Sequence, residues 1–477
     1  MTGLPVYFEQ RRVGTIDVNS KGPSFTYDAN WISLSGAFPI SITMPLKSGR
    51  ISPDVFLPWA ANLLPESEQL RTVGQLLGMA RGDVVGLLSA IGGDTAGALS
   101  IGQPGRTASF QWRPIDKPED LERMIEGLPS KPFLVGEEGV SMSLAGVQTK
   151  LAVAIDNANR VCIPMNGSPS THILKPDSPR LSGGVQNEAF CLTLARRLKI
   201  QTPSITTGRA GQRTYLLLQR YDRTSVQDRW RRLHQEDYCQ AFGKLPSAKY
   251  EANQTGIPGP TLKDMFQLTR GYMPSIDIVR LLDMAVFNIL TCNTDAHAKN
   301  YSIMIRGNGV SLAPMYDVMC GEVWENITKN LAQKIAGESR GDCLKGRHWL
   351  RFARECGLNP SQVLDRVGAL SRAAITEAQA AASEVAAMPA GTHAIIEQAR
   401  QAVERRAEVI FAQLQEVGAE PEAEEMAAHK ANTGFAANDC PHEPAVTKPH
   451  MDPPGAPQAQ PGAASLSSRA ERTPAVV

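Results

Sequence analysis

The sequence lacks several features that mark large classes of protein. Its eight cysteines stand singly, without a CxxC pair, which argues against a zinc cluster or a disulfide framework and suits a reducing cytosol. No run of about 18 apolar residues occurs, and the opening residues MTGLPVYFEQRR hold no apolar signal core. The net charge is only +1, so there is no general reason to expect a nucleic-acid or membrane partner. We therefore expect a cytoplasmic globular protein without a membrane partner.

The length and the local patterns indicate several domains. A chain of 477 residues is too long for one small hydrophobic core. Its first hundred residues mix a strand hairpin over 6–18, a helix that begins at Pro53, and a helix followed by a strand that ends near Ile101. A polar stretch then indicates a boundary.

Strand patterns dominate the middle of the chain and helix patterns the later part. LAVAI, HILKP and TYLLLQRYD have strand lengths, and one helix over 187–198 interrupts them, with Asn187 as a plausible N-cap. Helices prevail after residue 235, and the helix over 276–290 has an apolar face that includes Val279. After Gly418 the composition turns to runs such as PPGAPQAQPGAAS, which cannot bury enough apolar surface to order the chain.

One short region carries an unusual set of polar residues. Asp295 and Asn300 are spaced as Asp-x-x-x-x-Asn, as in a protein-kinase catalytic loop, where the Asp accepts the substrate proton and the Asn holds a metal ion. YSIMI, the turn RGNG and VSLAP then predict a β-hairpin. Asp317 follows it, and an aspartate there suits Mg²⁺ bridging two phosphates. The order of these residues favours phosphoryl transfer, although each of them alone is also explained by capping a turn.

Two residues inside the same loop have more than one explanation. His297 either ligates a metal ion or orients the loop, and Lys299 either neutralises phosphate charge or lies on the surface as a solvated lysine.

A second region offers a place for phosphate groups. SLAGVQTKLAVAI contains a short loop with Gly146, flanked by Gln148 and Lys150, whose backbone N–H groups suit phosphates, although a plain turn also fits. Lys175 ends the strand THILKP in the way that the β3 lysine of a kinase does, and the next helix contains Glu188 as a candidate partner. Lys175 also fits the end of an edge strand, and both residue types are common on surfaces.

The segment LLLQRYDR falls where the two lobes of a kinase join. The backbone around Gln219, Arg220 and Tyr221 is there available to an adenine ring.

Taken in order, these motifs resemble the HipA family of serine/threonine kinase toxins from bacterial toxin–antitoxin modules. The resemblance rests on GDTAGALSI, SLAGVQTK, THILKP, NEAFCLTLARRL, QRYDR, RLHQEDYCQAFG with KYE, NTDAHAKNYSI and LAPMYDV, and covers about residues 1–415. It implies an α+β, two-lobed protein-kinase-like fold with a small β-rich N-terminal subdomain and a mostly helical C-terminal lobe. We predict an N-terminal subdomain over 1–105, an N-lobe over 106–225, a helical C-lobe over 226–417 and a disordered tail over 418–477.

The resemblance also implies ATP and Mg²⁺ as cofactors and roles for individual residues. Asp295 matches the catalytic aspartate, Asn300 and Asp317 match the metal ligands, and Lys175 matches the ATP lysine. Ser143, just before the phosphate loop, matches a serine whose autophosphorylation inactivates the enzyme by expelling the loop. The full set of nucleotide-binding candidates is Ala145, Gly146, Val147, Gln148, Lys150, Lys175, Gln219, Arg220, Tyr221, His297 and Lys299.

Family membership further implies macromolecular partners. These are a HipB-like helix-turn-helix antitoxin, operator DNA bound mainly through that antitoxin, and a protein substrate such as glutamyl-tRNA synthetase, whose phosphorylation arrests growth. Two alternatives remain. One is a nucleotide-binding pseudokinase that acts as co-repressor with the antitoxin. The other is a metal-dependent hydrolase using Asp295, His297 and Asp317, which leaves Lys175 and the LAGVQTK loop unexplained.

Overall fold

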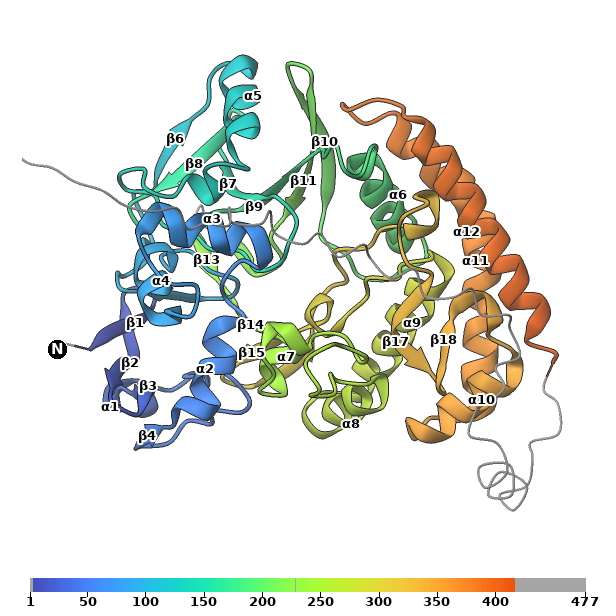
Figure 1. Cartoon of the computed structure of the whole chain (residues 1–477), viewed down its shortest axis with the longest axis horizontal. Helices are drawn as coiled ribbons and strands as arrows, with labels where there is room; N and C mark the ends of the chain where they lie inside the picture. The colour runs from blue at the N-terminus through green and yellow to red at the C-terminus, as the bar shows by residue number, and fades with distance from the viewer. Residues whose placement is uncertain (1–2, 228, 417–477) are drawn as a thin grey trace, which may run out of the picture. The chain divides into compact units, whose positions relative to one another are not determined.

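The computed structural model describes residues 3–227 and 229–416, and the predicted tail over 418–477 lies outside them. The N-terminal part is a five-stranded antiparallel sheet of order β4-β3-β2-β1-β5 with helices beside it (Figure 1). Its elements are β1 Leu4–Phe8, β2 Arg11–Asn19, β3 Gly22–Tyr27, α1 Ala29–Ile32, β4 Arg50–Ile51, α2 Pro53–Ala61, α3 Ser67–Leu77, α4 Val84–Ile91 and β5 Leu99–Ile101. The predicted hairpin, helices and closing strand are confirmed.

A six-stranded antiparallel sheet of order β10-β11-β9-β7-β8-β6 forms the middle of the chain. Its elements are β6 Gln111–Pro114, α5 Pro118–Gly127, the short 3₁₀ turn Pro132–Leu134, β7 Leu151–Ile155, β8 Val161–Met165, β9 His172–Pro176, α6 Gly184–Arg197, β10 Ile205–Ala210 and β11 Arg213–Gln219. The three strand segments expected from the sequence all lie in this sheet.

The remaining elements are mainly helical, with three small sheets. The strands are β12 Arg223–Val226 paired with β13 Arg229–Arg232, β14 His234–Asp237, β15 Ser302–Arg306 and β16 Gly309–Leu312 in one sheet, and β17 Asn330–Ile335 paired with β18 Glu338–Arg340. The helices are α7 Tyr238–Ala241, α8 Leu262–Tyr272, α9 Ser275–Leu290, α10 Gly346–Glu355, α11 Pro360–Ala386 and α12 Ala394–Gln413, with 3₁₀ turns at Pro246–Ala248, Ala298–Asn300, Gly321–Val323 and Gly341–Cys343. The predicted hairpin is β15–β16.

Helix α6 is buried on nearly all sides. It packs between strands β10 and β11 and helices α11 and α12 (Figure 1). Its buried positions include the polar residues Gln186, Asn187 and Glu188 as well as apolar ones, so these polar side chains need partners inside the fold. This burial puts Glu188, an acidic residue of α6, where it needs a charged partner.

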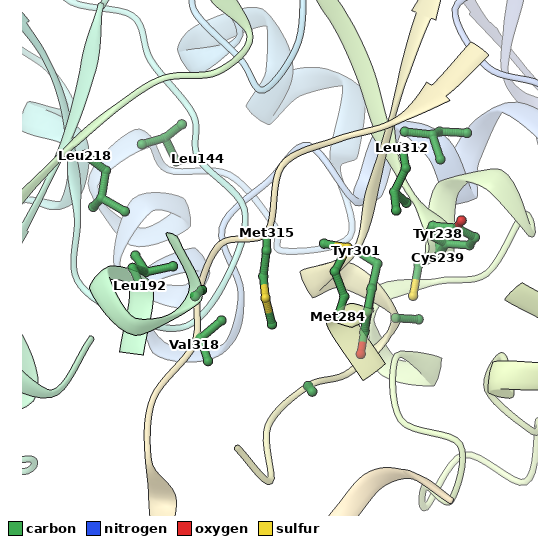
Figure 2. Close-up of a cluster of buried hydrophobic side chains, with 14 of the residues drawn as sticks. Leu144, Leu192, Leu218, Tyr238, Cys239, Met284, Tyr301, Leu312, Met315 and Val318 are labelled. Atoms are coloured by element: carbon green, nitrogen blue, oxygen red, sulfur yellow. The ribbon is translucent and has the colours of Figure 1, made fainter. Parts of the chain in front are cut away.

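A buried hydrophobic cluster anchors the loops that carry the candidate site residues. Figure 2 shows Leu144, from the loop before β7, in one cluster with Leu192 of α6 and with Met315 and Val318, which flank Asp317. Packing of this kind restricts the side chains to single rotamers. The loop over 143–150 and the segment around Asp317 are thus held by a common core.

Two details differ from the sequence-based expectation. Helix α6 begins after Gly183, so Asn187 lies inside the helix and not at its N-cap; its amide bonds the backbone of Cys320 instead, with Nδ2 3.0 Å from the carbonyl oxygen and Oδ1 2.8 Å from the nitrogen. Val279 of α9 is 45% exposed, because the buried stripe of this helix runs along other positions. Among the described residues, no helix is long and apolar enough to cross a membrane.

A buried group of charges joins the N-terminal sheet to the rest of the chain. Asp94, between α4 and β5, accepts hydrogen bonds from Arg223 (2.7 Å) and Arg232 (3.3 Å), and Arg220 pairs with Asp222 (2.6 Å). All five side chains are less than 5% exposed. The motifs GDTAG and QRYDR therefore meet here, each compensating the buried charge of the other.

We predict that Asp94→Asn lowers the free energy of unfolding by about 3 kcal/mol, because it leaves buried guanidinium groups uncompensated. Burial alone would raise the pKa of Asp94, but the three arginines hold it well below its usual range, so its contribution is present at neutral pH and lost as pH falls below about 4. Asp116→Asn is the control, since Asp116 is 65% exposed in its pair with Arg160 and should cost under about 1 kcal/mol. Equal losses in denaturant unfolding of the two variants would contradict the prediction.

Candidate functional site

Lys175, at the end of β9, forms ion pairs with two carboxylates. Its Nζ atom lies 2.6 Å from Oε1 of Glu188 on α6 and 2.6 Å from Oδ1 of Asp317. The side chains of Lys175 and Glu188 are 7% and 1% exposed, whereas Asp317 keeps 28%. Burial opposes the charge on Lys175, but the two carboxylates outweigh it and raise its pKa above the ordinary value. The predicted pairing of Lys175 with Glu188 is present, and it brings an ammonium group to Asp317.

Asp317 is held ionised by its surroundings. Burial would raise the pKa of this carboxyl, but the ammonium groups of Lys175 and Lys150 hold it well below its usual range. Its backbone is left-handed, with φ of 58°. That conformation is uncommon outside glycine and is found preferentially at functional sites. An anionic carboxylate in a constrained position results.

The loop of residues 143–150 runs directly into β7. Lys150 folds back so that its Nζ donates to the carbonyl oxygen of Ala145, 2.9 Å away. Gly146 has a φ of +107°, which favours glycine, and a Cβ atom there would lie 2.8 Å from Lys150 Nζ and displace that ammonium group. Burial lowers the pKa of Lys150 to about 8, with Asp317 opposing that shift. Val147 is exposed and Gln148 is partly exposed on the same loop.

Residues 62–69, here called the linking segment, hold this loop from the N-terminal part of the chain. Ser143 Oγ donates to the carbonyl oxygen of Leu63 (2.7 Å), the backbone nitrogen of Glu66 donates to the carbonyl oxygen of Gly146 (3.1 Å), and Gln69 Nε2 donates to that of Val147 (2.6 Å). Ser143 itself is fully buried. The loop is thus fixed by hydrogen bonds from outside its own sheet.

Asp295 lies on the loop between α9 and β15. Its Oδ1 atom accepts a hydrogen bond from the hydroxyl of Tyr250, 2.5 Å away. Asn300 closes the loop, because its Nδ2 donates to the backbone oxygen of Asp295 at 2.8 Å. Asp295 is open to solvent on one side, yet protein packed on its other sides disfavours the charged form and raises its pKa, against the hydrogen bond from Tyr250.

His297 is buried beside the same loop. Its Nδ1 atom has no hydrogen-bond partner among the described residues, and the ring meets that of Tyr250 edge-on at 5.0 Å. Burial and the charge of Lys249 lower the pKa of His297 well below its usual value, so the imidazole is neutral. A neutral ring with one open nitrogen suits either of the roles left open by the sequence.

The side chains of two predicted nucleotide-binding residues, Lys299 and Arg220, bond other protein groups. The Lys299 ammonium lies 2.6 Å from Asn62 Oδ1 and 3.0 Å from Asp237 Oδ2, and it is 4% exposed, so neither the phosphate nor the surface explanation fits. The Arg220 guanidinium belongs to the buried charge group around Asp94 and Asp222. Both side chains hold the N-terminal part to the rest of the chain, so we remove Lys299 from the nucleotide-binding candidates. The expectation for Arg220 concerned its backbone and stays a prediction.

Two further nucleotide-binding candidates, Gln219 and Tyr221, lie at and just after the end of β11. Gln219 is exposed at the end of the strand. The ring of Tyr221 lies 5.6 Å from that of Tyr316, the residue before Asp317, and its hydroxyl donates to Gln235. The aromatic pair thus lies next to the residue that Lys175 contacts, and Tyr316 and Gln235 were missed by the sequence reasoning.

The two predicted metal ligands, Asp317 and Asn300, have donor atoms that fit a hard divalent ion. Asp317 supplies an ionised carboxylate, and Asn300 has an amide oxygen without a hydrogen bond among the described residues. Oxygen ligands of this kind suit Mg²⁺, which usually takes one or two protein ligands and completes its shell with phosphates and water. Nowhere in residues 3–227 and 229–416 do three His, Cys, Asp or Glu side chains gather to hold a metal, so the trio that the hydrolase alternative needs is not assembled.

Tyr250 and Glu66 are further residues that the sequence reasoning missed. Glu66 bonds Lys249 at 2.8 Å, and Tyr250 bonds Asp295. The available signal for Tyr250 was the KYE motif, which carried the family resemblance but no assigned role. Nothing in the sequence near Glu66 indicates that it meets residues almost two hundred positions away.

Comparisons with known proteins agree with this geometry. Residues 4–102 match the HipA N-terminal domain, and residues 142–383 match the HipA-like C-terminal domain. The chain is 33% identical over 375 residues to the putative kinase Y4mE of Sinorhizobium fredii, covering 76% of this chain and 88% of that protein. It is 29% identical over 382 residues to the serine/threonine-protein kinase toxin HipA of Shewanella oneidensis, covering 77% and 87%.

A solved structure matches the fold. It is the Shewanella oneidensis HipA in complex with HipB and operator DNA, with a TM-score of 0.75 and 27% identity, covering 87% of this chain and 99% of that one. The two-lobed α+β fold expected from the sequence is therefore confirmed. With both of its domain models matched and its relatives named as kinases, the chain belongs to the HipA family.

Proposed function

We propose that the protein is an ATP- and Mg²⁺-dependent serine/threonine protein kinase. The observation that carries this proposal is the contact of Lys175 with both Glu188 and Asp317, each at 2.6 Å. Kinases that transfer phosphoryl groups use a fixed ammonium group beside a metal-binding carboxylate. Groups already in place stabilise the negative charge of the phosphates without a free-energy cost for rearranging side chains. Asp295 and Asn300 share one loop, and Asp295 is close enough to Asp317 for the charge of that residue to raise its pKa, which supports the proposal.

Each residue then has a distinct task. Lys175 and the backbone of the loop over 143–150 would bind the phosphates of ATP, and the ring pair of Tyr221 and Tyr316, next to Asp317, is our candidate for packing against the adenine or ribose. Asp317 and Asn300 would hold Mg²⁺, which when bound would offset negative charge on the phosphates. Asp295 orients the acceptor hydroxyl and takes its proton; its raised pKa makes it the more basic of the two aspartates.

Ser143 is proposed as the site of self-limiting autophosphorylation. Because Ser143 is fully buried and bonded to Leu63, it cannot accept phosphate until the loop leaves its place. A phosphate there would then carry close to two negative charges and could not return beside the carbonyl oxygen of Leu63. Burial and charge together support a one-way switch.

The proposed biological role is that of a toxin in a toxin–antitoxin module. The Shewanella relative is named a kinase toxin and was solved with HipB and its operator DNA. By analogy, we propose a small helix-turn-helix antitoxin as partner, with DNA bound mainly through it, in the cytoplasm. The proposed target is a translation-related protein, such as an aminoacyl-tRNA synthetase.

Mass spectrometry after incubation with Mg²⁺ and ATP tests the kinase proposal. We expect phosphoserine at Ser143 in the wild type and a rate at least 100-fold lower in Asp295→Asn, because a positioned general base contributes about that much. Asp365→Asn, at an exposed position of α11, serves as control and should match the wild type.

Other results have defined meanings. ATP binding without phosphate on any residue of the wild type would favour the co-repressor pseudokinase. A wild-type rate in Asp295→Asn would remove Asp295 from the mechanism, and absence of both binding and transfer would refute the kinase assignment.

The burial of Ser143 makes a second prediction. Gln69→Ala removes one hydrogen bond that holds the loop at Val147, worth about 1 kcal/mol, so Ser143 should be phosphorylated roughly fivefold faster. Hydrogen exchange of amides 143–148 should rise in parallel, and that measurement does not require kinase activity. Gln75→Ala on the same helix α3 is the matched control; equal exchange in the two variants would show that the linking segment does not retain the loop.

A further inference from the structure

Tyr250 makes a contact that the proposed mechanism does not yet use. Its hydroxyl donates to Oδ1 of Asp295 at 2.5 Å. Across the described ranges 3–227 and 229–416, no other side chain has a hydrogen bond to this carboxylate. Oδ2 is consequently left without a protein donor among these residues.

The tyrosine is itself held firmly against the loop that carries Asp295. The carbonyl oxygen of Lys249 accepts a hydrogen bond from the backbone nitrogen of Ala298 (3.1 Å), and Asn253 Nδ2 donates to the carbonyl oxygen of Tyr250 (3.0 Å). The ring meets His297 edge-on at 5.0 Å. These contacts come from both sides of Tyr250 and do not involve Asp295, so the hydroxyl is placed independently of the residue it bonds.

In this hydrogen bond Tyr250 is the donor and Asp295 is the acceptor. A phenol donates to a carboxylate and not the reverse, and burial together with the negative charge of Asp295 raises the pKa of Tyr250 above its ordinary value. Tyr250 therefore keeps its proton and does not compete with Asp295 as a base. A lone aspartate has a broad preference for rotation about χ2, and a fixed donor to one oxygen restricts that rotation.

We propose that Tyr250 is a positioning residue: its hydroxyl fixes Oδ1 of Asp295 and so presents Oδ2 to the acceptor hydroxyl. This inference rests on the proposed kinase function. Nearby charge supports the same arrangement, since Lys249 is joined to Glu66 at 2.8 Å and keeps its ammonium group close to the ring of Tyr250, 5.5 Å from the centroid. The linking segment that holds the phosphate loop thus also supports the residue that orients the base.

The inference is tested with Tyr250→Phe in the full-length protein. We expect the rate of Ser143 phosphorylation at saturating ATP to fall about tenfold, the effect of losing one hydrogen bond to a charged group. The half-saturating ATP concentration, the affinity for a non-hydrolysable ATP analogue and the melting temperature should stay at wild-type values. Tyr272→Phe is the control, because Tyr272 is 55% exposed on α8.

Three results would overturn the inference. An unchanged rate would show that Asp295 does not need the hydroxyl. Weaker analogue binding in proportion to the slower rate would place Tyr250 in the nucleotide site instead, and a lower melting temperature with the same loss would make its role structural. No phosphate on the wild type would refute the proposed function itself. That failure is seen in the wild type, whereas the other three results are differences between Tyr250→Phe and an active wild type.

Discussion

The placement of the loop over 143–150, the proposed phosphate loop, depends on hydrogen bonds from the linking segment. Ser143, Gly146 and Val147 are each bonded by residues 62–69, and two of these three bonds end on main-chain oxygen atoms of the loop itself. Main-chain contacts fix the position of a loop without depending on its side chains, and each is worth about 1 kcal/mol. A loop with glycine at a left-handed position has little rigidity of its own, so this outside support is what gives it one conformation. The N-terminal part of the chain is thereby a structural component of the site, not an appendage.

Buried charges extend this coupling to the other side of the site. Lys299 is bonded to Asn62, and Lys249 to Glu66, so the linking segment meets both the phosphate loop and the loop that carries Asp295. The group around Asp94 joins the same parts again farther from the site. Burying any of these cations without its partner would cost free energy. Separating the two parts would therefore leave several buried charges without partners at the same time. We infer that the parts move as one body or separate at several contacts at once.

The elements and the local order of the site residues were predictable, whereas the long-range partners were not. The hairpin β15–β16 and the pair of Lys175 with Glu188 follow from apolar periodicity and from spacing, both of which are local signals. Lys299 was assigned to the nucleotide because a cation near a phosphate-binding motif has that explanation from sequence alone, and Arg220 because its backbone falls where the two lobes of a kinase join. The Lys299 side chain bonds Asn62, which is distant in the sequence. The Arg220 side chain bonds Asp222, only two residues away, but it also pairs with Asp94, and only the tertiary fold buries these charges together. The domain limits and the chemical role of each site residue stay predictions.

The two aspartates of the candidate site show how one residue type can suit the two different tasks that we propose for them. Asp317 faces Lys175 and Lys150, and these charges keep it ionised far below the usual pH range. Asp295 has no cation bonded to it among the described residues; burial raises its pKa, and the hydrogen bond from Tyr250 and the more distant charge of Lys249 oppose that rise without cancelling it. A carboxylate that binds a metal should hold protons weakly, and one that accepts a proton should hold them more strongly. The surroundings separate the two pKa values in the directions that these tasks require, so the division of labour follows from neighbouring charge and burial, not from the residues themselves.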